Sequence, residues 1–252
     1  MLLKHNYHMH TARCGHAIGT DREYVEAAIR LGIETLGFSD HTPQNWPSVG
    51  IRMECDQLEE YVESVLRLKD EYRSEIRILL GLEVEYYRED FDEWQKMVEP
   101  YPFDYFLLGQ HYIGRERTEH RRSDKPSSSR TDLTLYVDQV LEALRTGKFL
   151  YLAHPDLLHY QDLNDPFYES EMTRLCQAAK EMNIPLEINL LGIWDHRWYP
   201  NPNFWQIAGK VGNDVILGAD AHQPYSLYRE DAVRIALDWI HQNHLHRIEK
   251  LL

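Results

Sequence analysis

Short apolar runs alternate with longer amphipathic stretches along the chain. This alternation is typical of β-α-β units, in which consecutive strands lie parallel in one sheet and helices cover its faces. The runs that we predict as strands are seven: residues 4–10, 35–39, 76–85, 103–110, 149–153, 185–190 and 214–219.

The amphipathic stretches between these runs predict the helices. Their expected ranges are residues 25–30, 58–72, 92–98, 133–145, 169–182, 204–210 and 231–241. Two helix starts carry a capping signature, Thr20 with Glu23 and Asp56 with Glu59, in which a side-chain oxygen accepts from an unpaired amide. The histidine-containing tail 241–246 is expected to be a solvated helix end.

The length of 252 residues suits one α/β barrel, so we expect residues 1–252 to form a single domain. A composition of 43% hydrophobic and 27% charged residues allows a full core and excludes disordered and collagen-like classes. No apolar run approaches the roughly 20 residues of a membrane span, which predicts no membrane partner. The three cysteines form no C-x-x-C pair and indicate reduced thiols, so a cytoplasmic location is expected.

The net charge restricts the partners of the chain. With 27 basic and 41 acidic residues, the charge is −14, which repels polyanions and argues against nucleic acid as the main partner. An anionic substrate would therefore need a local positive site. One segment, 114–130, is net positive and is either a solvated mobile loop or a lid that draws an anion toward the site.

Histidines and carboxylates gather where the predicted strands end. In a parallel barrel these carboxyl ends open on one face, so the side chains there converge. One such side chain is usually a packing residue, but six strands share the feature here. The residues concerned are His8, His10, His16, Asp40, His41, Glu83, His111, His154, Asp220 and His222. Neutral imidazole and carboxylate are ligands for Zn²⁺, Mn²⁺ and Fe²⁺, and the set is too large for one ion.

In this order and on these elements, the residues resemble the PHP (polymerase and histidinol phosphatase) family of metal-dependent phosphoesterases. The loop from His10 to Ala17 is similar to the monofunctional histidinol-phosphate phosphatase branch. The resemblance implies a distorted (β/α)7 barrel of PHP type, with its active site at the carboxyl ends of the strands. It also implies hydrolysis of a small phosphorylated substrate, L-histidinol phosphate, by metal-activated hydroxide attack on phosphorus.

The resemblance further implies three divalent ions, of zinc, manganese or iron. His8, His10, Glu83 and Asp220 would hold the first ion, and Glu83, His111 and His154 the second. His16, His41 and His222 would hold the third. Such a centre would attract a phosphate dianion despite the acidic surface, because the cations outweigh the carboxylates beside them.

Further residues are candidates for substrate binding and catalysis. Arg197 is predicted to neutralise phosphate oxygens, and Arg13 is a second candidate because it lies in the ligand-bearing loop. Asn189 could hydrogen-bond substrate or a metal ligand, with a structural role as the alternative. Glu85 could hold a cationic amine of the substrate or instead orient a metal-bound imidazole. Asp220 and His222 are expected to be catalytic as well as metal-binding. Asp156, a neighbouring histidine or a metal-coordinated water could protonate the leaving group.

Three alternatives remain open. The chain could hydrolyse another small phosphate ester or a nucleotide within the same family. An amidohydrolase-like enzyme is the second alternative, although the bridging lysine typical of that class has no counterpart in residues 103–111. A metal-binding module without activity is the third, and it predicts the loss of at least one ligand. The sequence does not indicate an oligomeric state.

Overall fold

The predicted apolar runs pair into a curled parallel sheet in the computed structural model, which describes residues 3–46 and 50–252. Within these residues the sheet has eight strands. In spatial order they are β1 (His5–Asn6), β2 (Thr35–Phe38), β3 (Arg77–Val84), β4 (Tyr105–Leu108), β7 (Tyr151–Leu152), β8 (Leu186–Asn189), β9 (Asp214–Gly218) and β10 (His246–Arg247). Every neighbouring pair is parallel, which confirms the expected α/β class.

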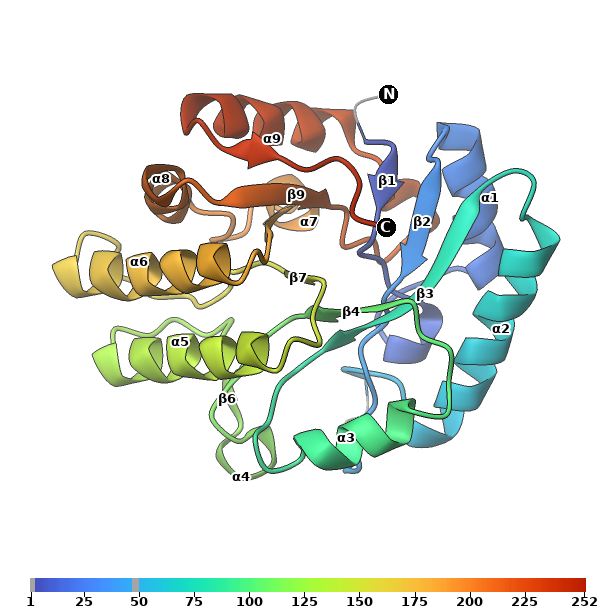
Figure 1. The fold of residues 1–252 in the computed structure, drawn as a ribbon, viewed down its shortest axis with the longest axis horizontal. Coiled ribbons are helices and arrows are strands. Elements are labelled where there is room, and N and C mark those ends of the chain that lie inside the picture. The colour runs from blue at the N-terminus through green and yellow to red at the C-terminus, as the bar shows by residue number, and fades with distance from the viewer. Residues whose placement is uncertain (1–2, 47–49) are drawn as a thin grey trace.

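Helices surround the outer face of the sheet, and Figure 1 shows them as a ring around the strands. They are α1 (Asp21–Leu31), α2 (Leu58–Glu71), α3 (Phe91–Val98), α4 (Glu116–Glu119), α5 (Arg130–Arg145), α6 (Pro166–Glu181), α7 (Leu190–Trp194), α8 (Pro202–Val211) and α9 (Glu230–Gln242). Short 3₁₀ turns occupy Ala12–Cys14, Cys55–Gln57 and Pro224–Ser226. None of the helices in the described part of the chain is long and apolar enough to cross a membrane.

One predicted helix start is confirmed and the other is wrong. The Thr20 side chain accepts from the Glu23 amide, and Glu23 accepts in return from the Thr20 amide at 2.7 Å. Asp56 does not cap α2, because a 3₁₀ turn precedes that helix. There the Glu54 amide donates to the Gln57 side chain at 2.8 Å, so the capping residue lies two positions before the one expected.

The two edges of the sheet meet at the carboxyl end. Met9 forms a parallel bridge with Ala221, and the His10 amide donates to the Ala221 carbonyl at 2.9 Å. At the opposite end β10 pairs with β9 instead, so the sheet is a distorted barrel rather than a regular one. The tail 241–246 is therefore not simply a helix end as predicted: α9 stops at Gln242, and His246 begins β10.

Beneath the carboxyl ends, tyrosines fill the inside of the curled sheet. Tyr7, Tyr105 and Tyr151 are buried there among aliphatic side chains. The Tyr105 hydroxyl lies 2.7 Å from the Tyr7 carbonyl and 3.0 Å from that of Phe38, so it joins β1 to β2 from within. This tyrosine layer lies directly beneath the side chains at the strand ends.

Two glycines make room for Tyr105. A β-carbon on Gly81 would lie 2.5 Å from the ring carbon Cζ, and one on Gly37 would collide mainly with the hydroxyl. We expect either alanine variant to lose about 1–3 kcal/mol of unfolding free energy in urea titrations, through overpacking. Tyr105→Phe should restore part of the loss in Gly37→Ala, where the hydroxyl is the obstacle, but not in Gly81→Ala. Equal behaviour of the two double variants would contradict this packing.

Candidate functional site

Glu83, at the end of β3, is the centre toward which the predicted ligands point. Its carboxylate is 1% exposed. One oxygen, Oε1, lies 2.8 Å from His154 Nε2, and the other, Oε2, lies 3.0 Å from His41 Nδ1. The Nε2 atoms of His8 and His10 are each 3.5 Å from Oε2, and Nε2 of His111 is 3.8 Å from Oε1.

Asp220, which follows β9, forms a second carboxylate centre beside the first. Its Oδ1 lies 3.0 Å from His10 Nε2 and 3.5 Å from His8 Nε2. Asp220 and His154 both have positive φ angles, of 48° and 28°. Such backbone is uncommon for non-glycine residues and is typical of functional positions.

The remaining imidazoles stack on one side of this pair. The His222 ring lies 4.1 Å from that of His10 and 4.8 Å from that of His16, and the His41 ring lies 4.2 Å from that of His10. The structure thus brings all nine predicted metal ligands into one continuous cluster, from strand ends that are more than two hundred residues apart in the chain.

Hydrogen bonds set the tautomers of four of these rings. Nδ1 of His8 donates to Glu187, and Nδ1 of His111 donates to Glu85. Nδ1 of His16 and Nδ1 of His222 each donate to a backbone carbonyl. The four distances are 2.7 to 3.0 Å. Each ring therefore presents Nε2 with its lone pair to the cluster, which is the form that binds a metal.

The charges and unpaired atoms of the cluster fit divalent cations. His8 Nε2, His10 Nε2 and Glu83 Oε2 are buried, and within the described residues their contacts with neighbouring ionisable groups lack good hydrogen-bond geometry. Unpaired buried polar atoms are costly, and a cation bound between them would satisfy all three. Groups of three donors, including His8 with His10 and Asp220, and His8 with Glu83 and His154, have ligand atoms within 4.8 Å of one another.

Proton affinities divide the imidazoles into two groups. Burial lowers the pKa of His41 and His222, with His10 adding to the effect, and that of His222 falls to about 3. These rings are neutral near pH 7, as ligation requires. Burial opposes protonation of His8 as well, but the carboxylates of Glu187, Asp220 and Glu83 raise its pKa well above the usual value. The surroundings of His8 therefore carry excess negative charge, which favours a bound cation.

Glu187 and Asn189 on β8 are functional residues of another kind. Glu187 orients His8, and Asn189 Nδ2 donates to Glu187 at 2.8 Å and to Asp220 at 3.0 Å. Asn189 is fully buried and contacts Asp220, which favours the expected hydrogen bond to a candidate metal ligand over a contact with substrate. Sequence reasoning missed Glu187, for which the available signal was a carboxylate within a buried apolar strand.

Glycines allow these carboxylates to lie against neighbouring strands. A β-carbon on Gly109 would overlap the Glu83 carboxylate, and one on Gly218 would overlap that of Glu187. Gly109 immediately follows a strand, and Gly218 ends one. A larger residue at either position would displace the carboxylate.

A cavity of about 590 Å³ opens over the cluster. Arg197 lines it, with its guanidinium 2.8 Å from both the Asp195 carboxylate and the Tyr199 hydroxyl. Glu85 also lines the cavity, although its contact with His111 favours the orienting role over a substrate contact. Apolar and aromatic side chains also line the cavity: Leu157, Leu191, Trp194 and Trp198.

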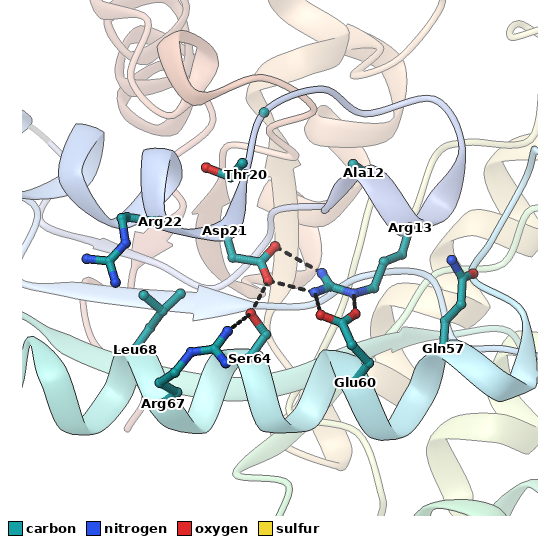
Figure 2. A pocket seen from close by; sticks show the side chains of 11 residues that line it. Ala12, Arg13, Thr20, Asp21, Arg22, Gln57, Glu60, Ser64, Arg67 and Leu68 are labelled. Atoms are coloured by element: carbon teal, nitrogen blue, oxygen red, sulfur yellow. Dashed lines mark hydrogen bonds and ion pairs between the residues drawn. The ribbon is translucent and has the colours of Figure 1, made fainter.

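Arg13 does not reach this cavity. Its guanidinium pairs with Asp21 at 2.8 Å and with Glu60 at 2.6 Å, and Figure 2 shows it between those carboxylates above α2, in a different hollow. This placement corrects the expectation that Arg13 binds substrate. Asp156 is likewise not among the cavity residues: its Oδ2 accepts from the Asn201 amide at 2.6 Å, and burial raises its pKa to about 7.

The positive segment 114–130, which we call the rim segment, is folded against the site. It contains α4 and strand β6 (Arg121–Arg122), which pairs antiparallel with β5 (Tyr112–Ile113). Arg122 and Asp124 line the cavity, and their side chains pair at 2.8 Å. The Ser123 amide donates to the His111 carbonyl at 2.7 Å, so the rim segment is attached directly to a site residue.

A family model for the PHP domain matches residues 6–191. This chain belongs to the PHP family. It is similar to the histidinol-phosphatase of Bacillus subtilis, with 34% identity over 87% of this chain and 94% of that protein. It is also similar to a protein of Deinococcus radiodurans named probable histidinol-phosphatase, with 31% identity over 86% of this chain and 85% of the relative.

Solved structures give the same fold. Histidinol phosphate phosphatase from Lactococcus lactis, in complex with zinc, L-histidinol and phosphate, has a TM-score of 0.73 and 19% identity, covering 97% of this chain and 95% of that one. The family resemblance and the PHP-type fold predicted from the sequence are therefore confirmed.

Proposed function

We propose that this chain is a metal-dependent phosphomonoesterase that hydrolyses L-histidinol phosphate to L-histidinol and phosphate, and that residues 1–252 act as one PHP-type domain. The observation that carries the proposal is the single cluster of nine ligand-type side chains, centred on the buried carboxylates of Glu83 and Asp220. The similarity to two proteins named as histidinol-phosphatases supports the substrate. The complex of the Lactococcus lactis enzyme with zinc, L-histidinol and phosphate supports it as well.

Within this proposal the cluster holds three divalent ions. The first position lies between His8, His10, Glu83 and Asp220, and the second between Glu83, His111 and His154. The third lies among His16, His41 and His222. The short distance from His41 to Glu83 supports a compact arrangement in which these positions adjoin.

When bound, divalent cations supply an activated water nucleophile and neutralise charge on the phosphate oxygens. Residues of the chain orient the metal ligands and bind the substrate. Glu187 and Glu85 hold His8 and His111 in their ligating tautomers, and Asn189 fixes the direction of Asp220. Arg197 faces the same cavity and can donate two hydrogen bonds to a phosphate group. The apolar wall of Leu157, Trp194 and Trp198 offers a surface for an imidazole ring.

Substrate turnover tests the proposal. We expect phosphate release from histidinol phosphate to stop after dialysis against a chelator and to return when Zn²⁺ or Mn²⁺ is added, because the nucleophile depends on the ions. The kcat/KM for histidinol phosphate should exceed that for a nucleoside monophosphate by about 100-fold or more. Activity that survives exhaustive chelation would contradict the metal mechanism. A preference for the nucleotide would instead overturn the substrate and favour the alternative ester.

The two arginines give a matched comparison. Arg197→Met should lower kcat/KM by about 100-fold, since it removes a guanidinium that lines the cavity proposed to hold the phosphate. Arg13→Met should leave kcat/KM close to the wild-type value and lower only the melting temperature, because the buried Asp21 loses its partner. Steady-state kinetics and thermal unfolding on the same preparations measure both effects. A larger kinetic defect in Arg13→Met than in Arg197→Met would reverse these assignments.

A further inference from the structure

We propose that a buried latch of Arg52, Glu116, Tyr87 and Glu85 positions His111, so that metal binding at the second position and the folding of the rim segment stabilise each other. The inference rests on the proposed function for its metal centre. It assigns a role to Arg52, Glu116 and Tyr87, which lie outside the ligand set.

The latch is built around an arginine that is almost removed from water. Arg52 is 4% exposed, and so is Glu116. Its guanidinium donates twice to Glu116, at 3.0 and 2.8 Å, and the same nitrogen that makes the shorter bond lies 3.5 Å from Glu85 Oε2. A two-pronged contact of this kind fixes the orientation of both side chains.

Tyr87 and Glu85 connect Arg52 and Glu116 to the metal cluster. The Tyr87 hydroxyl lies between the two carboxylates, within hydrogen-bond distance of Glu85 Oε2 and 2.8 Å from Glu116 Oε2. The other oxygen of Glu85, Oε1, accepts from His111 Nδ1 at 2.9 Å. The Glu85 carboxylate is therefore held from behind while it aims the His111 ring at Glu83.

Charge makes Arg52 the member on which the others depend. Glu85 and Glu116 are two buried carboxylates, and the Arg52 guanidinium is the cation that contacts both. Without it, two negative groups would share a site of low polarity, which disfavours keeping both buried and ionised. Glu85 would then turn toward the cavity, which it already lines, and release His111.

The latch also connects the α4 end of the rim segment to the metal cluster, in addition to the hydrogen bond from Ser123 to His111. Glu116 begins α4 in the rim segment, whereas His111 precedes β5. If Glu116 and Arg52 hold His111 in its ligating position, a metal bound there must in turn favour the position of Glu116. Such coupling is reciprocal by thermodynamic necessity.

Arg52→Met tests the inference on the full chain, with metal content and hydrogen exchange as readouts. Wild-type protein and variant are dialysed against zinc-buffered solutions, and bound zinc is counted per chain. We expect one of the bound equivalents to bind about 10–100-fold more weakly in the variant, as when a partner of a metal ligand is removed. In the wild type, added zinc should slow amide exchange in residues 114–122, and in Arg52→Met it should not.

Arg115→Met is the matched control, because Arg115 lies on the same segment but pairs at the surface with Glu89. It should keep both the zinc content and the exchange response of the wild type. Glu116→Gln should behave like Arg52→Met. If Arg52→Met does not fold, Tyr87→Phe, which removes one hydroxyl, carries the same comparison.

The possible outcomes separate the two proposals. A wild-type chain that binds no zinc would overturn the metal centre itself. A wild-type chain that binds zinc, together with an Arg52→Met variant of equal affinity and equal exchange response, would overturn the latch and leave the centre intact. Loss of one zinc equivalent without any change in the exchange response would limit Arg52 to positioning His111 and refute the coupling to the rim segment.

Discussion

A carboxylate that is taken out of water must be balanced by positive charge, and Glu83 is the point where this molecule meets that requirement. Its side chain is 1% exposed and is surrounded by imidazoles, and burial lowers the pKa of His41, the imidazole that lies nearest to Oε2. Removing an ionised carboxylate from water costs several kcal/mol unless it is paired. Cations bound between Glu83, Asp220 and the imidazole nitrogens that face them would supply that balance, and the other features of the site keep these groups together.

Contacts within the sheet hold the strands together beneath the site, and a cavity lies above it. Tyr105 joins two strands from inside the sheet, and the bridge between Met9 and Ala221 closes its carboxyl end. Gly109 and Gly218 let the carboxylates lie against the backbone. The cavity above is lined by Arg197 and by Arg122 of the rim segment, each paired with an aspartate, so on a chain with a net charge of −14 the positive charge that attracts a phosphate would come mainly from cations bound at the cluster.

Most of the strands and the whole ligand set were predictable because parallel strands bring their carboxyl ends to one face. His8 and His10 share a strand direction, and Glu83, His154 and Asp220 each mark a strand end. Features set by distant partners were not predictable. Arg13 is held outside the cavity by Asp21 and Glu60, and Glu187 contacts His8 from a strand far along the chain. The two-residue strand β10 is too short and too polar to leave a periodic pattern.

Anomalous diffraction from crystals grown with zinc tests the central claim most directly. The account predicts peaks within the cluster at about 2.0–2.2 Å from imidazole nitrogens and carboxylate oxygens, with Glu83 contacting two of the ions. Crystals that show no peak among these nine side chains, or zinc bound only at the protein surface, would contradict it.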